Sequence, residues 1–494
     1  MRFAWLVVAI FAARFLATAI VYPQVDGDLS WQRWLGARIL AGGAIPRALG
    51  SETFTAAGSP WLPQEWAFSL VASLARGGLP WALFAGAVAL AAVAALGLAA
   101  AQGERRGASP RALVLCATLA GIALFNSFGV RVQVLAWLPM VAFLALLEVD
   151  GPWCYGAIAV AALWSNLHAS AMLAPVLAAL AALGSALDER GWTPRVRRSA
   201  LVALGSLGAI CLNPFGWQLA IYAIGLFASP FKALIGEWKV SDVDDFSFAC
   251  GALPLLLLGA LTGLRGERRF RDTLVLGAAT WLLLGAARNI AVFGLVALPI
   301  VAASLSRAFP WFAPPSPAPP SRSDRIAAFA LPAVALGLAL VVASVLVREA
   351  PHDGGGELAG PAIQALARAP GEHRVFCADF AWCGRVVGLP HDRVFLDGRA
   401  DPYPQAVWDD FAAIAFLRPE WRERLAARGV DTVVVGRGAR LDQALERDAR
   451  WHAAFGDKDY RLWVLAPSAP RSPRRSSFVP GLRSGADGEV VRGS

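Results

Sequence analysis

The chain has 494 residues, of which 57% are hydrophobic and only 16% are charged, and its mean hydropathy is +0.52. Close to a quarter of the residues of soluble globular proteins are charged, so this composition excludes an ordinary soluble protein and predicts an integral membrane protein. The formal net charge of +9 does not indicate nucleic-acid binding, because most arginines flank apolar segments, where basic residues set membrane topology and contact anionic lipid.

The first apolar segment, residues 3–21, follows Met1 and Arg2. It is long for the core of a signal peptide, and the sequence around Val21 lacks the small residues of a cleavage site. We therefore expect an uncleaved first transmembrane helix. Further apolar segments approach or reach the ~20 residues that span a bilayer; examples are 81–101, 153–167, 172–187, 272–286, 290–305 and 326–347.

Basic loops predict the orientation of these helices. Positive charge marks the cytoplasmic side, so the segments 104–111, 188–198, 265–271 and 307–325 are expected to lie there together with the N-terminus. The number of crossings between them must then be even. About eleven transmembrane helices satisfy this condition if the segment 61–76 lies along the outer surface, and the last helix, 326–347, places the C-terminal part outside.

The C-terminal part has the pattern of a small extracytoplasmic α/β domain. Short apolar runs predict strands at 375–380, 394–397, 430–435 and 462–465. Amphipathic stretches predict helices at 364–368, 405–416, 420–428 and 441–448. The predicted domains are a multi-spanning α-helical membrane domain, residues 1–348, with its first outer loop at 23–80; a linker, 349–360; the soluble α/β domain, 361–467; and a disordered tail, 468–494.

The six cysteines match no zinc-binding spacing. Cys377 and Cys383 lie close together in the predicted α/β domain, where a disulfide would fit an extracytoplasmic location. The sequence leaves open whether they form one.

Polar residues of the membrane half collect at the outer ends of the predicted helices. Such side chains are costly at membrane depth and usually have a function. The candidates are Asp26, Asp28, Glu65, Arg131, Gln133, Asn166, His168, Glu237, Arg288 and Asn289. Each also has a local explanation: the two aspartates would form a turn, the histidine would cap a helix, and the arginines would anchor helix ends. Their position at one end of the helices predicts a shared extracytoplasmic cavity.

Several of these residues stand in motifs that resemble a group of bacterial membrane proteins related to GT-C-type glycosyltransferases. The motifs are DGDLSW (26–31), WSNLH (164–168), NPFG (213–216), EW (237–238), RN (288–289) and FLDGRAD (395–401). The resemblance implies a GT-C-like fold in the bacterial inner (plasma) membrane. It also implies transfer of a sugar from a polyprenyl-phosphate donor to an acceptor glycan, lipid or protein on the extracytoplasmic face.

The resemblance further implies that an acidic residue just after the first helix is the catalytic base, a place that Asp26 and Asp28 both match. Many relatives have two adjacent acidic residues there, whereas Gly27 separates them here, so the choice between them stays open. In the C-terminal domain, a structural turn with an Asp–Arg pair is the favoured explanation of FLDGRAD over substrate binding.

Sugar transfer accounts for the residue types in this set. An acceptor hydroxyl needs a base and a departing phosphate needs positive charge, which an aspartate and Arg288 or Arg131 would supply. A guanidinium group suits phosphate because its N–H groups form a fork. A divalent cation, Mg²⁺ or Mn²⁺, bound by Asp26, Asp28 and His168 would replace or assist the arginines. We expect direct displacement with inversion at the anomeric carbon.

Two other functions compete with transfer. A transporter or flippase would place the same polar cluster at the mouth of a substrate path, but transporters commonly contain internal repeats and broken helices at the membrane midplane, and the sequence shows neither clearly. A catalytically inactive envelope assembly protein is the second alternative, because membership of a fold group does not establish chemistry.

Overall fold

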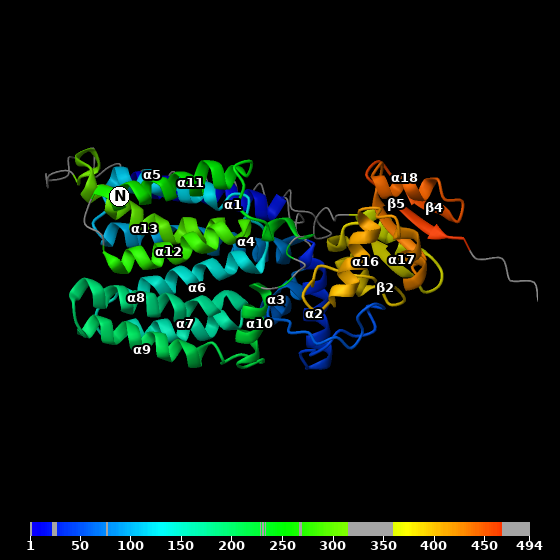
Figure 1. The fold of residues 1–494 in the computed structure, drawn as a ribbon, viewed down its shortest axis with the longest axis horizontal. Helices are drawn as coiled ribbons and strands as arrows, with labels where there is room; N and C mark the ends of the chain where they lie inside the picture. Colours follow the sequence, from blue (N-terminus) through cyan, green and yellow to red (C-terminus); the bar gives the residue numbers. More distant parts are fainter. Residues whose placement is uncertain are drawn as a thin grey trace, which may run out of the picture.

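The computed structural model describes residues 2–21, 27–75, 78–227, 229, 232, 234–265, 269–314 and 359–466. A long helical bundle lies beside a smaller part that contains the sheet (Figure 1). The predicted helix 326–347, the linker up to residue 358, the tail 468–494 and Asp26 lie outside the described residues.

Antiparallel helices form the bundle. Within the described residues they are α1 (Arg2–Val21), α4 (Gly78–Arg105), α5 (Pro110–Ala123), α6 (Val132–Leu147), α7 (Gly156–Ser165), α8 (Leu173–Glu189), α9 (Pro194–Ala209), α11 (Leu253–Arg265), α12 (Phe270–Gly285) and α13 (Ile290–Ala308). Four spans are long and apolar enough to cross a membrane: Leu79–Arg105, Ala169–Glu189, Phe248–Arg265 and Ala287–Ala308. The prediction of a polytopic α-helical membrane protein is confirmed, whereas the number of about eleven transmembrane helices is not.

Small side chains allow the central helices of the bundle to approach closely. Almost all residues of α13 are buried. A Cβ atom added to Gly294 of this helix would lie 2.9 Å from the Cβ of Ala123 at the end of α5. Helix association in lipid relies on such close packing, because lipid tails are as apolar as the side chains and provide no hydrophobic driving force.

Ion pairs join the helices at the end of the bundle that carries the basic loops. Arg106, which follows α4, contacts Asp272 of α12 at 2.7 Å and Glu148 after α6 at 2.9 Å. Arg271 of α12 contacts the same Glu148 at 2.8 Å. A buried charge without a partner is strongly destabilising, so these arginines hold helix ends together in addition to the topological role expected from the sequence.

The smaller part contains a five-stranded mixed sheet in the order β2-β1-β3-β5-β4. The strands are β1 (Arg374–Cys377), β2 (Arg393–Val394), β3 (Thr432–Gly436), β4 (Trp451–Gly456) and β5 (Tyr460–Leu465). Pairing is parallel between β1 and its neighbours β2 and β3, and antiparallel between β5 and its neighbours β3 and β4. The remaining elements are α15 (Gly360–Arg368), α16 (Gln405–Ala415), α17 (Trp421–Arg428), α18 (Arg440–Glu446) and the 3-10 segment η8 (Phe380–Gly388).

The α/β class of this part was predicted correctly, but one strand was missed. Strand β4 lies at the edge of the sheet, and residues 452–454 in its middle are exposed. It therefore has no alternation of apolar and polar residues that would mark a strand in the sequence.

The first loop, residues 27–75 in the described part, packs against the sheet as well as against the bundle. Its helices are α2 (Asp28–Gly42) and α3 (Trp66–Leu74), and α3, with nine residues, is too short to span a bilayer. The amide of Val394 on the edge strand β2 donates to the Glu52 carbonyl at 2.9 Å. Trp31, Trp61 and Phe395 belong to one hydrophobic core. The loop and the C-terminal domain therefore form a continuous packed unit.

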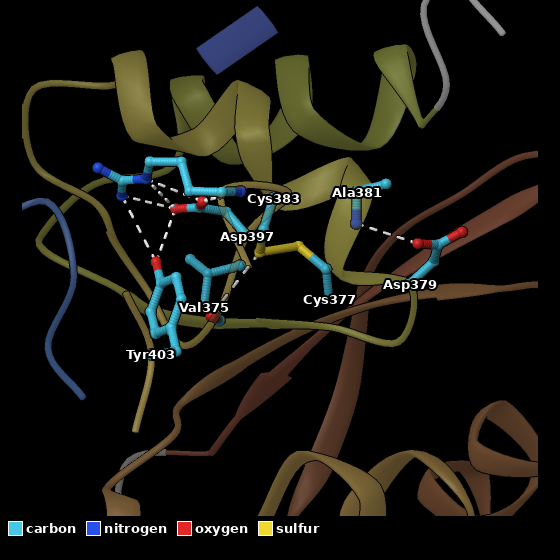
Figure 2. The surroundings of a disulfide bond; sticks show 8 residues. Val375, Cys377, Asp379, Ala381, Cys383, Asp397 and Tyr403 are labelled. Atoms are coloured by element: carbon cyan, nitrogen blue, oxygen red, sulfur yellow. Dashed lines mark hydrogen bonds and ion pairs between the residues drawn. A yellow bond between two sulfur atoms is a disulfide. The ribbon is translucent and has the colours of Figure 1, made fainter. Parts of the chain in front are cut away.

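Cys377 and Cys383 form a disulfide bond that joins β1 to η8. Figure 2 shows it next to Asp397, the third residue of the FLDGRAD motif. Both cysteines are buried. The bond fixes η8 on the sheet, and η8 in turn packs against the start of α2, where Gly384 lies close to Trp31.

Candidate functional site

A cavity of about 450 Å³ lies where the bundle, the first loop and the C-terminal domain meet. This volume falls within the roughly 300–1,000 Å³ of small-molecule sites. Eight of the candidate residues line it: Asp28, Glu65, Arg131, Gln133, His168, Glu237, Arg288 and Asn289. The tertiary structure thus brings together residues that are up to 261 positions apart in the chain.

Asp28 is the first residue of α2, so its carboxylate stands at the positive end of the helix dipole. The indole Nε1 of Trp31, one turn later, donates to Asp28 Oδ1 at 3.0 Å. Gly398 of the FLDGRAD motif packs against the same oxygen, because a Cβ atom at this glycine would lie 2.3 Å from it. The first loop and the C-terminal domain together determine where the carboxylate of Asp28 lies.

Two arginines share one carboxylate in the cavity wall. Arg131, just before α6, contacts Glu237 at 2.9 Å, and Arg288, just before α13, contacts it at 3.5 Å. The guanidinium of Arg288 also lies 4.4 Å from the ring centre of Trp238. Burial raises the pKa of Glu237, but the charges of Arg131 and Arg288 outweigh burial and lower it to about 2. Glu237 is therefore ionised and lies between the guanidinium groups of Arg131 and Arg288 in this wall.

His168 both caps a helix and lines the cavity. Its Nδ1 accepts the backbone N–H of Ser170 at 3.1 Å, at the start of the 3-10 segment η2 (Ala169–Met172). Burial and the charges of Arg288 and Arg131 lower the pKa of His168 to about 3. The ring is therefore neutral, and because Nδ1 is an acceptor its proton is on Nε2.

Three further candidates differ in their positions. Glu65 is buried and accepts a hydrogen bond from the amide of Gln32 in α2. Asn289 lines the cavity while its amide donates to the Leu282 carbonyl at 2.9 Å. Asn166 is not among the cavity-lining residues, and its amide donates to the carbonyls of Ala162 and Leu212 at 2.9 and 2.7 Å. These bonds close the end of α7, and Asn166 is not part of the cavity wall.

The FLDGRAD motif divides into a structural part and a cavity part. Arg399 is fully buried and contacts Asp397 at 2.6 Å and Glu52 of the first loop at 2.8 Å. The hydroxyl of Tyr403 also donates to Asp397, at 2.7 Å. These contacts match the structural Asp–Arg turn that the sequence favoured. Asp401 differs, because it lines the cavity and accepts a hydrogen bond from the Tyr222 hydroxyl.

Asp401 and Tyr222 were missed as site residues. Tyr222 belongs to α10 (Gln218–Phe227), a short apolar helix in which nothing in the sequence marks a functional side chain. Asp401 was visible as the last residue of FLDGRAD, but the motif reads as a turn when its tertiary contacts are unknown. Burial raises the pKa of Asp401 to about 6, although the Tyr222 hydrogen bond and Arg288 act in the opposite direction.

The predicted metal set is not tested by these contacts. Asp28 and His168 line the same cavity, but the third predicted ligand, Asp26, lies outside the described residues. Among the residues that the structure describes, no three His, Cys, Asp or Glu side chains are grouped so that they could hold a metal ion. The described part of the set does not by itself make a metal site.

No protein-family model and no curated protein matches the sequence. Solved structures do match the fold. The archaeal oligosaccharyltransferase AglB from Archaeoglobus fulgidus, in complex with an inhibitory peptide and a dolichol-phosphate, aligns with a TM-score of 0.55 and 13% identity over 87% of this chain and 69% of its own. The Archaeoglobus fulgidus oligosaccharyltransferase in complex with Zn and sulfate aligns with a TM-score of 0.51 and 15% identity over 87% and 68%.

ArnT from Cupriavidus metallidurans, bound to undecaprenyl phosphate, aligns over 94% of this chain and 98% of its own, with a TM-score of 0.48 and 16% identity. At the identities of the two oligosaccharyltransferase matches, a structural match establishes the fold alone, since one fold supports many activities. The chain therefore has the fold of the GT-C-type membrane glycosyltransferases, as its sequence motifs indicated.

Proposed function

We propose that the protein is a glycosyltransferase that moves a sugar from a polyprenyl-phosphate donor to an acceptor on the extracytoplasmic face of the bacterial inner membrane. One observation carries the proposal: a single cavity is lined by the carboxylate of Asp28, the guanidinium groups of Arg131 and Arg288, and the neutral imidazole of His168. These groups are a base, two phosphate-binding cations and a hydrogen-bond donor.

In the proposed reaction Asp28 accepts the proton of the acceptor hydroxyl. The acceptor oxygen forms a bond to the anomeric carbon from one side, while the bond from that carbon to the phosphate oxygen breaks on the other side. The electron pair of the broken bond leaves with the polyprenyl phosphate, and Arg288 and Arg131 stabilise the resulting negative charge. Because attack and departure occur on opposite sides, the product has inverted configuration.

Glu237 has a positioning role in this scheme. It lies between the two guanidinium groups, which would otherwise repel each other, and its charge is permanent because its pKa is about 2. The phosphate would then meet two oriented cations. His168 would donate a hydrogen bond from Nε2, since its Nδ1 is already an acceptor.

The fold comparison adds support for a lipid-phosphate donor. The AglB structure of the same fold contains a dolichol-phosphate, and the related oligosaccharyltransferase structure contains Zn. For this chain we propose a polyprenyl-phosphate-linked sugar as the donor. A divalent cation, Mg²⁺ or Mn²⁺, is a separate proposal with no step assigned to it.

Turnover tests the proposal directly. Purified protein in lipid nanodiscs is incubated with radiolabelled undecaprenyl-phosphate sugars and a cell-envelope extract as acceptor, with and without EDTA followed by Mn²⁺. We expect release of undecaprenyl phosphate together with label in the extract. If the labelled lipid instead crosses the membrane of sealed vesicles that contain the protein, without transfer, the transporter is indicated. If neither transfer nor lipid movement occurs, the assembly protein is indicated. Full activity in EDTA would show that transfer does not require a divalent cation.

The proposed orientation has its own test. The disulfide between Cys377 and Cys383 favours an oxidising compartment for the C-terminal domain. We expect reporter enzymes fused after Gly107 and Gly191 to be active in the cytoplasm, and a reporter fused to the C-terminus to be active outside. The reverse pattern would place the cavity on the cytoplasmic face and contradict extracytoplasmic transfer.

A Gly398→Ala substitution tests whether the C-terminal domain positions Asp28. The added methyl group would lie 2.3 Å from Asp28 Oδ1 and 3.2 Å from Trp31 Nε1, so the carboxylate has to move. Since a displacement of about 1 Å can cost about a hundredfold in rate, we expect a loss of this order in kcat with the donor KM nearly unchanged.

Gly388→Ala in η8 is the matched control, because its new Cβ would meet only Trp34, at 3.8 Å. Melting temperatures of both variants report on folding. An unchanged kcat in Gly398→Ala would show that the position of Asp28 does not depend on this glycine.

A further inference from the structure

Two aspartates of the same loop are placed differently. Asp397 is fully buried and its carboxylate is occupied by Arg399 and Tyr403. Asp401, four residues later, lines the cavity and accepts a hydrogen bond from the Tyr222 hydroxyl. The first aspartate therefore maintains the loop, whereas the contacts of the second do not account for its position.

The carboxylate of Asp401 is half-buried in the cavity wall and so is partly withdrawn from water. Among the described residues no arginine, lysine or histidine lies within ion-pairing distance of it, although Arg288 is near enough for its charge to lower the pKa of Asp401. Removing a carboxylate from water without a cationic partner is unfavourable, and such groups in cavities are candidates for a function. A carboxylate has about four acceptor positions, so the bond from Tyr222 leaves capacity for a ligand.

We propose that Asp401 binds a hydroxyl group of the donor sugar. Through this residue the C-terminal domain determines which sugar the cavity binds. This inference rests on the proposed transferase function and adds a specificity-determining residue to it. Tyr222 acts as a positioning residue, because its hydroxyl holds one carboxylate oxygen of Asp401 and links α10 to the C-terminal domain.

The position of Asp401 favours the sugar over the lipid or the phosphate as its ligand. The carboxylate is negative and would repel phosphate, which the nearby Arg288 attracts, so a sugar bonded to that phosphate lies between the two residues. The aromatic side chains of Trp61, Trp238 and Phe380 line the same cavity and make part of its wall apolar, which suits the C–H surfaces of a sugar ring. A carboxylate beside aromatic walls suits a ligand that is rich in hydroxyl groups.

Binding measurements separate the sugar from its carrier. The probes are undecaprenyl phosphate alone and undecaprenyl phosphate carrying glucose, mannose or arabinose, titrated against the full-length protein in nanodiscs. We expect wild type to bind at least one sugar-bearing probe more tightly than the bare lipid phosphate. Asp401→Asn keeps the shape of the side chain but loses the charge-assisted hydrogen bond, which weakens binding of that probe about ten- to hundredfold.

Bare undecaprenyl phosphate should bind Asp401→Asn as tightly as wild type. Tyr222→Phe should show a smaller loss, of up to about tenfold, for the same sugar-bearing probe alone. Asp409→Asn is the matched control, because this exposed aspartate of α16 bonds only to Gln405 among the described residues, and it should bind both kinds of probe normally.

The inference is overturned if Asp401→Asn binds the sugar-bearing probe as tightly as wild type, or if it loses both probes equally, since the residue would then act on the whole site. It is also overturned if wild type binds no sugar-bearing probe better than the bare lipid. These results leave the transferase proposal standing, whereas failure of wild type to bind even undecaprenyl phosphate would remove the transferase proposal itself.

Discussion

An Asp28→Asn protein is expected to fold normally and to lose about 10²- to 10⁴-fold in kcat, the range that a general base contributes. The amide oxygen of asparagine can still accept the hydrogen bond from Trp31 Nε1, so the local structure is retained. What disappears is the ability to take the proton of the acceptor hydroxyl. Single-turnover transfer from a radiolabelled undecaprenyl-phosphate sugar measures the effect.

Two companion variants decide whether the effect is specific. Asp244→Asn changes an exposed aspartate at the same end of the bundle that does not line the cavity, and it should transfer at the wild-type rate. Asp26→Asn settles which of the two acidic residues of the DGD motif is the base. Full activity in Asp28→Asn combined with a large loss in Asp26→Asn would assign the role to Asp26.

Replacing Arg288 with glutamine is expected to reduce kcat about 10²- to 10³-fold, by analogy with the loss of one oriented donor to a developing negative charge. The same change should also weaken the binding of bare undecaprenyl phosphate, because Arg288 would contact the phosphate before and after the reaction. Arg131 keeps its contact with Glu237 at 2.9 Å, so one phosphate-binding cation remains and activity does not vanish.

Arg307→Gln is the matched control for this variant. Arg307 lies in the last turn of α13, whereas Arg288 lies in the 3-10 segment Ala287–Asn289 that precedes this helix, so the two changes remove a guanidinium group near opposite ends of α13. We expect Arg307→Gln to retain donor binding and transfer. Equal losses in the two variants would mean that the effect comes from α13 itself, and the phosphate-binding role of Arg288 would be withdrawn.

The gathering of the site residues was largely predictable from the sequence. In an antiparallel bundle every second helix end lies on the same side, so Arg131, His168 and Arg288 could be placed at one end once the basic loops had been assigned to the other. Polar residues at membrane depth are also rare, which makes them visible against an apolar background. Eight of the candidates do line one cavity.

The contribution of the C-terminal domain was not predictable in the same way. Asp397 and Asp401 stand four positions apart in one motif, and only their contacts distinguish the structural aspartate from the one in the cavity. Tyr222 sits in an apolar helix whose composition predicts burial and nothing more. Asn166 is the opposite case, a predicted site residue that does not line the cavity. It lies at the expected end of its helix, but its side chain bonds to the backbone.

Composition and hydropathy by themselves determined that this chain is a helical membrane protein with an α/β domain at its C-terminus. Contact with lipid requires long apolar helices, whereas contact with water on one face requires short amphipathic elements, and each pattern is visible within a single segment. The tertiary structure alone decided that the first loop and the C-terminal domain share a core, that Gly398 lies against Asp28, and that Asp401 reaches Tyr222. Those contacts join residues more than 170 positions apart, and their energies depend on the shape of both partners, which no local pattern records.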